Sequence, residues 1–415
     1  MRVADAGTSG GGEASPTRGS RGRLPRIGLV AACRFPAPRG SQVLVDGMAR
    51  ALAAAGADVR LIAPIAPGFR RPFAMHSLAR ADELPSAEPR LGGLRRVLDD
   101  ARLASRLREV VARERIDVLH AHNYEALVAS LRVKAAVGVP VVFHAHSVLS
   151  DELPLYATSR VLPSAAARRI GSWFDRVFPR LADLVVTLSP DVAGYMETCG
   201  VDRERISVVP PGLAATARPP ADGRGAPRAV FTGNLDRYQN LDLLLDAWAE
   251  VERRVPAASL AIVTHERTRP VLSGRHRSLG RVEVVRARTL EDVSSQWTRA
   301  TVGVSPRTSW SGFPVKNLNY MAAGLPIVAF EGSAKGVCDG HGGWVVRDGS
   351  PGALAAALCG ALDDVRTSAL RGRWAHEALL ERHDWPMLAD RLLRISVAAA
   401  GEARGTGLPS RSAAG

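Results

Sequence analysis

Near-continuous apolar runs that alternate with helical segments are the feature that most constrains how this chain can fold. RIGLVAAC begins at Arg26, ADVRLIAP at Ala57, IDVLHAH at Ile116 and VPVVFHAH at Val139. Strands buried on both faces have this composition, and they occur in parallel sheets that helices cover on both sides. The first half of the chain is therefore expected to be an α/β unit built on a parallel sheet.

The same alternation starts again after the Pro-Pro-Gly sequence at 210–212, which we interpret as a hinge. A chain of 415 residues is also long for one hydrophobic core. We therefore expect an α/β protein with two parallel-sheet domains that face each other across a cleft. The expected boundaries are a disordered tail at 1–23, a first domain at 24–211, a second domain at 212–375, helices at 376–400 that close the chain and pack back on the first domain, and a disordered tail at 401–415.

The formal net charge of +14 is carried almost entirely by arginine, since Lys134, Lys316 and Lys335 are the only lysines. Nucleic-acid binders more often concentrate charge in an arm or a stripe with aromatic residues, and no zinc-finger or basic-zipper pattern occurs. Nucleic acid is therefore not an expected partner. An anionic substrate or an acidic membrane surface is compatible with the charge.

The four cysteines are far apart in the sequence and form no Cys-x-x-Cys pair, which is typical of a reducing compartment. The first apolar segment, Ile27 to Cys33, is too short for a membrane-spanning helix and for the hydrophobic region of a signal peptide. We therefore expect a cytoplasmic protein, with peripheral contact at the inner face of the membrane as an open option.

Two His-Ala-His triplets end successive apolar runs, at His120–His122 and His144–His146. Side chains two residues apart lie on the same face of a strand, and ligands of open parallel sheets bind beyond the carboxyl ends of the strands. A metal site needs further ligands, and neither triplet has a nearby Cys or His-x-x-x-His partner. Lining of the cleft is the preferred interpretation. A metal site, as in a metal hydrolase, and a purely structural role are the alternatives.

Several phosphate-binding motifs are absent: no lysine follows a glycine, and neither Gly-x-Gly-x-x-Gly nor Asp-x-Asp occurs. A bound diphosphate would therefore be neutralised by Arg, Lys and backbone amides. The stretch SPRTSWSGFPVKNLNYMAAGLPIVAF from Ser305 offers such a site, because a strand, a loop with Arg307 and Gly312, and a helix follow one another. Pro314 and Lys316 fall in the first turn of that helix. In the alternative interpretation, Gly312 serves only a turn and Lys316 is solvated.

Six stretches of the chain, taken in order, resemble the retaining glycosyltransferases of family 4, which have the GT-B fold of two Rossmann-like parallel-sheet domains. They span roughly residues 26–348 and are PRGSQVLVDGMARALAAAGADVRLIAP, DVLHAH, ADLVVTLS, RISVVPPG, RAVFTGNL and SGFPVKNLNYMAAGLPIVAF. The resemblance implies a nucleotide-diphosphate sugar held by the second domain and an acceptor held by the first. It also implies transfer with retention to a polysaccharide, glycolipid or small-glycoside acceptor, with no metal or other cofactor, so that catalysis is mostly positioning and charge stabilisation.

Position by position, the resemblance gives a set of candidate site residues. The catalytic candidates are His122, His146 and Ser311, with His122 the preferred neighbour of the transferred sugar. The donor-binding candidates are Gly40, Ser41, Gly233, Asn234, Arg237, Gln239, Arg307, Gly312, Phe313, Pro314, Lys316 and Asn319. The acceptor-side candidates are Asn123, His144 and Glu152; Glu152 belongs to a DELP segment that either forms an acceptor-side loop or merely turns the chain.

Four customary donor contacts of the family are changed in this chain. Two glutamates eight positions apart are replaced by Ser311 and Asn319, and an Arg and a Lys are replaced by Asn234 and Gln239. Either the donor site is rebuilt, or the chain is a non-catalytic GT-B-like protein that binds a glycan or a nucleotide. A sugar-nucleotide epimerase of related fold is a further alternative. The candidates to replace the lost positive charge are Arg237, Arg307 and Lys316.

One predicted helix combines an aromatic face with arginines, and it has two interpretations. It either lies on an anionic membrane near a lipid-linked acceptor or packs on the sheet with solvated arginines. The aromatic face holds Trp173, Phe174, Val177 and Phe178, and the arginines are Arg168, Arg169, Arg176 and Arg180.

Overall fold

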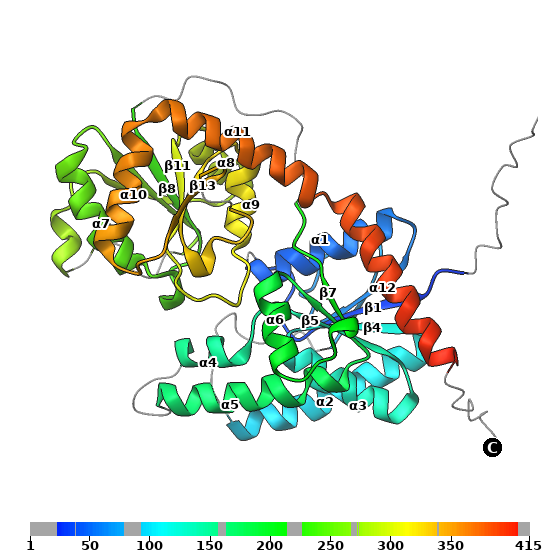
Figure 1. Ribbon diagram of the computed structural model, residues 1–415. Coiled ribbons are helices and arrows are strands. Elements are labelled where there is room, and N and C mark those ends of the chain that lie inside the picture. Colours follow the sequence, from blue (N-terminus) through cyan, green and yellow to red (C-terminus); the bar gives the residue numbers. More distant parts are fainter. Residues whose placement is uncertain are drawn as a thin grey trace, which may run out of the picture.

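The protein forms two α/β units, each a parallel sheet with helices on both faces (Figure 1). The resemblance to the GT-B fold is thereby confirmed at the level of architecture. The computed structural model describes residues 23–37, 39–78, 93–156, 163–213, 226–266, 272, 274–337 and 340–405, with the side chains of 93–102 and 402–405 left out.

The sheet of the first domain has the strand order β3-β2-β1-β4-β5-β6-β7, and each neighbouring pair is parallel. Its strands are β1 (Arg26–Ala31), β2 (Asp58–Ala63), β3 (Ala74–Ser77), β4 (Val118–His122), β5 (Val141–Ala145), β6 (Leu184–Thr187) and β7 (Ile206–Val208). Its helices are α1 (Gly40–Ala54), α2 (Gly93–Glu114), α3 (Asn123–Val137), α4 (Leu149–Tyr156), α5 (Ser164–Val177) and α6 (Pro190–Thr198), with 3-10 turns η1 (Pro179–Leu181) and η2 (Arg203–Arg205).

The sheet of the second domain has the order β10-β9-β8-β11-β12-β13 and is also parallel. Its strands are β8 (Arg228–Thr232), β9 (Ser259–Thr264), β10 (Val282–Arg286), β11 (Val302–Ser305), β12 (Ile327–Phe330) and β13 (Gly343–Val346). The helices are α7 (Leu241–Arg254), α8 (Leu290–Thr298), α9 (Val315–Ala322), α10 (Pro351–Asp363), α11 (Val365–Arg382) and α12 (Trp385–Gly405), with 3-10 turns η3 (Arg237–Gln239), η4 (Gly274–Ser278) and η5 (Glu331–Ser333).

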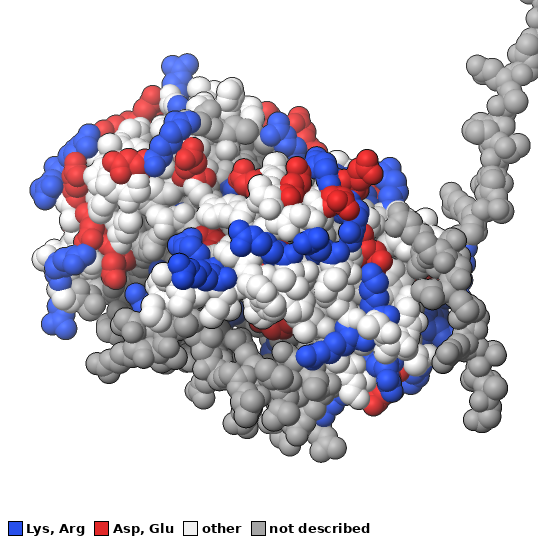
Figure 2. Space-filling view, turned by 60° about the horizontal axis from the view of Figure 1, so that its bottom comes forward, with Lys and Arg blue, Asp and Glu red and all other residues white. Residues whose placement is uncertain are grey.

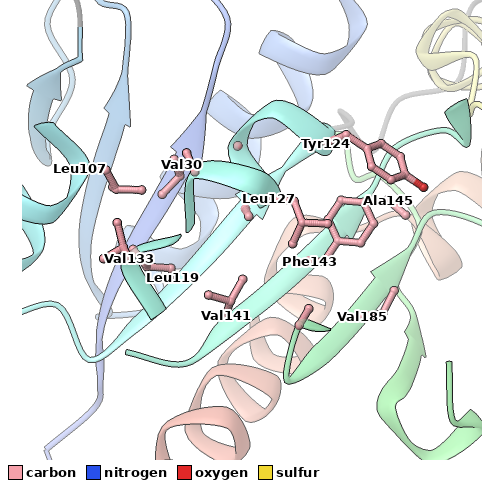
Figure 3. Packing of buried hydrophobic residues seen from close by; sticks show 14 of the residues in the cluster. Val30, Leu107, Leu119, Tyr124, Leu127, Val133, Val141, Phe143, Ala145 and Val185 are labelled. Atoms are coloured by element: carbon pink, nitrogen blue, oxygen red, sulfur yellow. The ribbon is translucent and has the colours of Figure 1, made fainter. Parts of the chain in front are cut away.

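The first sheet buries apolar side chains on both faces, which explains its near-continuous apolar strands. Val118 packs on the face that α1 and α12 cover, and the next residue, Leu119, packs on the face that α2 and α3 cover (Figure 3). Because side chains alternate along a strand, the histidines of β4 lie on the α1 and α12 face with Val118. His144 shares that face with its strand neighbour Val142.

The last helix, α12, crosses back from the second domain and packs on α1 of the first (Figure 1). Trp385, at its start, fills a notch formed by two glycines, because a Cβ on Gly47 would lie 2.6 Å and one on Gly212 2.5 Å from the indole. The backbone N–H of Leu213 donates to the carbonyl of His383 at 3.0 Å, so the two segments that connect the domains run side by side. α12 extends to Gly405, five residues beyond the end that the sequence suggests.

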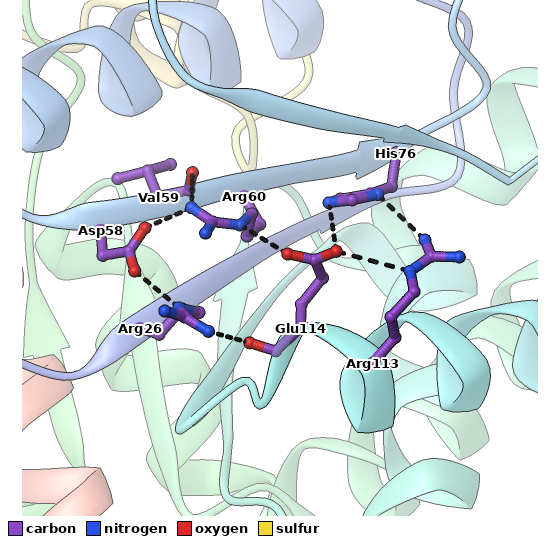
Figure 4. A network of polar contacts seen from close by, with 7 residues as sticks. All are labelled: Arg26, Asp58, Val59, Arg60, His76, Arg113 and Glu114. Atoms are coloured by element: carbon purple, nitrogen blue, oxygen red, sulfur yellow. Dashed lines mark hydrogen bonds and ion pairs between the residues drawn. The ribbon is translucent and has the colours of Figure 1, made fainter.

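A polar network joins the amino-terminal ends of strands β1 and β2 of the first sheet to the end of α2 (Figure 4). Arg26 of β1 binds Asp58 of β2 at 2.6 Å, and Arg60 binds Glu114 at the end of α2 at 3.1 Å. Hydrogen bonding from Arg60 lowers the pKa of Glu114. The network lies away from the strand ends that carry the candidate site, so its role is structural.

Candidate active site

The carboxyl ends of the two sheets face each other, because segments that follow strands in one domain contact segments that follow strands in the other. Arg39, after β1, forms an ion pair with Asp236, after β8, at 3.1 Å. Asp151, after β5, accepts hydrogen bonds from the backbone N–H of Ser311 at 3.1 Å and from its hydroxyl at 2.8 Å. Ser311 follows β11. Segments that carry candidate residues in the two domains are thus in contact.

Two further contacts join the domains on the Ser311 side. Lys335, in the second domain, forms an ion pair with Asp191 in the first turn of α6. The Trp310 ring lies 5.4 Å from the Tyr195 ring in an edge-to-face arrangement. The loop that follows β11 is therefore docked on α4 and α6 of the first domain.

The ammonium group of Lys316 lies among residues of the second domain. Its Nζ donates to Oε1 of Gln239 at 2.6 Å and lies 4.0 Å from the centre of the Phe231 ring. Gly233 leaves the necessary space, because a Cβ there would be 3.2 Å from Nζ. Desolvation, with repulsion from Arg307 as the smaller cause, lowers the pKa of Lys316 to about 7. A bound anion would favour the protonated form that burial disfavours.

Arg307 places a second cation beside Lys316. Its Nε donates to the hydroxyl of Ser309, and its guanidinium lies 5.4 Å from the centre of the Tyr238 ring. A Cβ on Gly312 would be 2.6 Å from its Nη2, so this glycine makes room for the guanidinium. In the described part of the chain, no carboxylate forms an ion pair with Arg307 or Lys316. Among the described residues the two cations therefore have no carboxylate in direct contact, although attraction to Arg307 opposes, to a small extent, the rise in pKa that burial causes at the nearby Glu152.

A chain of polar side chains links Lys316 to the first domain. Gln239 donates from Nε2 to Oδ1 of Asn234 at 2.8 Å, and Asn234 donates from Nδ2 to Asp236 at 2.7 Å. Asp236 in turn holds Arg39. The two positions that carry Arg and Lys in the family thus hold neutral amides that connect a lysine of one domain with an arginine of the other.

Two helix N-termini meet at the same place. A Cβ on Gly40, the first residue of α1, would lie 3.6 Å from Cγ2 of Val315, the first residue of α9. Neither helix has a side-chain cap. The N–H of Asn317 donates to the carbonyl of Pro314 at 2.9 Å, whereas the earlier first-turn N–H groups, including that of Ser41, remain for an anion among the described residues. Pro314 is the residue that precedes α9. Arg237, a donor candidate from the sequence, is exposed on η3.

The four histidines of β4 and β5 form a buried layer that hydrogen-bonds in pairs. Nδ1 of His120 lies 2.8 Å from Nε2 of His144, and Nδ1 of His122 lies 3.0 Å from Nε2 of His146. Burial lowers the pKa of His120 to about 3 and that of His146 to about 4. Burial, with repulsion among the rings as a smaller cause, also lowers the pKa values of His122 and His144. The layer is therefore uncharged at neutral pH.

Ser396 of α12 fixes the tautomers in half of this layer. Its hydroxyl donates to the backbone carbonyl one turn earlier at 2.8 Å and lies 2.9 Å from Nε2 of His120. His120 therefore donates from Nε2, and its Nδ1 accepts from His144. Among the described residues, Nε2 of His122 and Nδ1 of both His144 and His146 are buried without a hydrogen-bond partner. These nitrogens have hydrogen-bonding capacity that no described residue uses.

Glu152 lies on a helix, and not in the loop or turn that the DELP segment suggests. The whole segment belongs to α4, whose first two backbone N–H groups donate to the buried carboxylate of Asp175 at 2.9 and 3.0 Å. Glu152 accepts from the Ser147 hydroxyl, and burial raises its pKa. Of the acceptor-side candidates, only Glu152 is thus carried by this helix next to Ser311; Asn123 begins α3 and His144 lies on β5.

Three other candidates lie at the edges of this arrangement. Asn123 begins α3 with a φ of 68° and is partly buried. The Phe313 ring lies 5.7 Å from the ring of His383 in the segment that connects the domains. Asn319 lies on α9 and is partly buried. None of these three side chains has a hydrogen-bond partner among the described residues.

Sequence reasoning missed three residues that the structure brings into the site, namely Arg39, Asp151 and Asp236. Each has its partner in the opposite domain or beside the domain interface. Their only sequence signal is their place in a segment that follows a buried strand, which is the region where ligands of parallel sheets bind.

Comparison with known proteins agrees with this arrangement. The family model described as Glycosyltransferase Family 4 matches residues 38–216, and the model described as Glycosyl transferases group 1 matches residues 226–364. The chain is similar to a phosphatidyl-myo-inositol mannosyltransferase of Mycobacterium leprae (strain TN), with 28% identity over 385 residues that cover 89% of this chain and 96% of the relative. D-inositol 3-phosphate glycosyltransferase 2 of Catenulispora acidiphila is 28% identical over 271 residues, which cover 60% of this chain and 62% of the relative.

Solved structures give the same fold. Sucrose-phosphate synthase from Thermosynechococcus elongatus has a TM-score of 0.75 at 17% identity and covers 91% of this chain and 99% of its own. Anabaena HepE in complex with UDP and glucose has a TM-score of 0.66 at 16% identity and covers 89% of this chain and 98% of its own. The chain therefore belongs to glycosyltransferase family 4 and is a glycosyltransferase with the GT-B fold.

Proposed function

We propose that this enzyme transfers a sugar from a nucleotide-diphosphate donor to a glycolipid or other glycan acceptor, with retention and without a metal ion. The cation pair of Lys316 and Arg307, at the meeting point of two helix N-termini and without a carboxylate in direct contact among the described residues, is the observation that carries the proposal. A diphosphate would bring negative charge into direct contact with both cations. The mannosyltransferase activity for which the Mycobacterium leprae relative is named and the UDP and glucose in the HepE complex support the same substrate class.

The histidine layer is proposed to face the transferred sugar. A neutral imidazole accepts or donates one hydrogen bond to a hydroxyl without adding a charge, and Nε2 of His122 is one of the buried atoms with this capacity. In a retaining transfer, the acceptor oxygen bonds to the anomeric carbon as the bond from that carbon to the phosphate breaks. The departing phosphate oxygen takes the acceptor proton, so the protein acts by positioning and charge stabilisation.

Metal independence is supported by the chemistry of the residues present. Lys316 and Arg307 provide the positive charge that a divalent cation would otherwise bring to a diphosphate. In the described ranges, no group of three or more His, Cys, Asp or Glu is arranged to hold a metal ion. The histidine nitrogens pair at 2.8 and 3.0 Å, whereas two nitrogens on one tetrahedral zinc ion, at about 2.0–2.1 Å each, lie roughly 3.3 Å apart.

A thermal-shift screen against UDP, GDP, UDP-glucose and GDP-mannose, repeated with EDTA, tests the donor site. At least one nucleotide should raise the melting temperature, and chelation should not abolish the shift. Incubation of the stabilising sugar nucleotide with membrane lipids should then release the free nucleoside diphosphate and give a glycosylated lipid. Binding without turnover would favour the non-catalytic alternative, a changed sugar on the nucleotide would favour the epimerase alternative, and no binding at all would refute the donor site.

We further propose that the acceptor is lipid-linked and that α5 meets the membrane. Arg169, Trp173 and Arg176 follow the spacing of one face of α5, and Arg180 lies on η1 directly after it. All four are exposed, Trp173 to 55%. Figure 2 turns the lower side of Figure 1 toward the viewer and shows a band of Lys and Arg across this side of the molecule. No helix in the described part of the chain is both long and apolar enough to cross a membrane. Such a basic face with an exposed tryptophan suits an anionic lipid surface.

Sedimentation with vesicles tests this surface. The protein should bind vesicles of phosphatidylcholine with phosphatidylglycerol more tightly than vesicles of phosphatidylcholine alone, and Arg169→Glu with Arg176→Glu should weaken that binding. Arg253→Glu changes the charge of an exposed residue on α7, in the second domain, and should have a small effect on vesicle binding. Equal binding of all three proteins would show that α5 is not the contact surface.

A further inference from the structure

The carboxylate of Asp151 occupies a place that the family signature assigns to another residue. Ser311 stands where family members usually carry a glutamate, and its hydroxyl and its backbone N–H both donate to Oδ2 of Asp151, at 2.8 and 3.1 Å. Ser311 is 1% exposed, so this contact is inside the domain interface. The carboxylate at this position thus comes from the first domain, one hydrogen bond away from the side chain of residue 311.

The first domain holds Asp151 in this position rigidly. Asp151 lies in the first turn of α4, and Asp175 binds the backbone of that turn. Asp175 is itself fully buried and also accepts from the hydroxyls of Tyr124 at 2.5 Å and Tyr195 at 3.1 Å. The same helix carries Glu152. A helix that is anchored at its first turn presents its carboxylates with little conformational freedom, as a substrate-binding group requires.

Asp151 also keeps capacity for a ligand. Both bonds from Ser311 go to Oδ2, and among the described residues Oδ1 accepts no hydrogen bond. An ionised carboxylate has about four acceptor positions, so it can bind a hydroxyl group while it holds Ser311. The donor loop with Arg307 and Gly312 lies next to Ser311, and the phosphates proposed to bind there would place the attached sugar close to this carboxylate.

We propose that Asp151, from the first domain, takes the place of the signature glutamate that the second domain lacks at Ser311, and that it binds a hydroxyl of the transferred sugar. The inference rests on the proposed function, because it assumes a sugar nucleotide in the site. Since Asp151 belongs to one domain and the phosphate site to the other, the sugar is held only when the domains are closed. Such an arrangement assembles the complete site on closure and thereby protects the donor from hydrolysis in the open enzyme.

The affinities of a sugar nucleotide and of its nucleoside diphosphate, measured by calorimetry on the full chain, test the proposal. The probes are UDP-glucose with UDP, or GDP-mannose with GDP, chosen as the pair that stabilises the protein. Asp151→Asn keeps the shape and can still accept from Ser311, but it loses the charge. Its ratio of Kd for the sugar nucleotide to Kd for the nucleoside diphosphate should rise about tenfold over wild type, because a charged hydrogen bond to the sugar alone is weakened.

Two further variants separate sugar binding from simple closure. Asp191→Asn weakens the ion pair with Lys335, the other carboxylate contact of the first domain at this side of the interface, and should leave the ratio of the two Kd values unchanged. Asp151→Ser combined with Ser311→Glu moves the carboxylate back to the family position and should restore the ratio to within about threefold of wild type. An unchanged ratio in Asp151→Asn would overturn the inference. Failure of the wild type to bind either nucleotide would instead overturn the donor site itself.

Discussion

Nζ of Lys316 donates to Oε1 of Gln239 at 2.6 Å. The ammonium group of a lysine at the start of α9 therefore lies beside position 239, where family members usually carry a lysine. The loss of the customary cation after β8 is therefore accompanied by a cation from another element at the same point in space. The donor site is rearranged and remains positively charged. This relationship favours a rebuilt site over a lost one.

Exchange of the two side chains tests whether the position of the charge matters more than its origin. Lys316→Gln should weaken nucleoside diphosphate binding by about tenfold to a hundredfold, since it removes one charged hydrogen bond to phosphate. Lys316→Gln combined with Gln239→Lys should recover most of that loss. Calorimetry with UDP or GDP measures both, and a double variant as weak as the single one would show that α9 itself must supply the cation.

The lowered pKa of Lys316, about 7, predicts proton uptake on donor binding. A diphosphate next to the ammonium favours the charged form, so binding should take up a larger fraction of a proton at pH 8 than at pH 6. The affinity should accordingly rise as the pH falls from about 8.5 to 7. Calorimetry in buffers of different ionisation enthalpy measures the uptake. Lys316→Met should abolish the pH dependence; a slope equal to that of wild type would assign the proton to another group.

The same shift predicts that Lys316 reduces the stability of the ligand-free enzyme. The folded-state pKa is depressed below the ordinary value of 10.5, so between pH 7 and 10.5 the unfolded chain binds the proton more tightly than the folded chain. Stability from this group is complete only above that window and falls as the pH is lowered through it. At pH 7.5, Lys316→Met should therefore melt at a higher temperature than wild type. Addition of the nucleotide should reverse the order, because only wild type binds it tightly.

Local sequence pattern predicted most of the strands, because strands buried on both faces have a composition that no exposed segment shares. It did not predict β3, whose sequence is AMHS and whose residues are partly or fully exposed at the edge of the sheet. Asn240 stands at the N-cap position of α7, but its side chain does not cap the helix, because it binds Pro306 and Thr308 of the donor loop, and its φ is 52°.

The residues of the candidate site also differ in how far the sequence predicts them. The chain order of strand, glycine loop and helix predicted the place of Arg307, Gly312 and Lys316, since these residues lie close together in the sequence. The contact between Asp151 and Ser311 joins residues 160 positions apart and exists only because two domains close on each other. No periodicity or local spacing encodes such a contact, and a carboxylate in a DELP segment has the same local sequence whether it turns the chain or reaches another domain.

The neutral histidine layer predicts a loss of stability in mild acid. The folded-state pKa values of His120 and His146, about 3 and about 4, are below the ordinary value of 6.5, so the unfolded chain binds more protons as the pH falls below 6.5. Their contribution is complete above pH 6.5 and decreases toward pH 4. His146→Asn should reduce the change in melting temperature between pH 7 and pH 5. His341→Asn, at an exposed ring, should leave that change unaltered.

Asp175 is predicted to be the residue on which the position of α4 depends most. Its buried carboxylate accepts from two backbone N–H groups at the start of α4 and from two tyrosine hydroxyls, and Asp175→Ala leaves all four donors without this partner. The free energy of unfolding should fall by about 3 kcal/mol in urea denaturation, because several buried donors lose their acceptor together. Asp202→Ala, at an exposed carboxylate, should change it by less than about 0.5 kcal/mol. Amide hydrogen exchange should accelerate first at Leu149 and Ser150, and uniform acceleration across the first domain would show that Asp175 supports the fold in general and not α4 in particular.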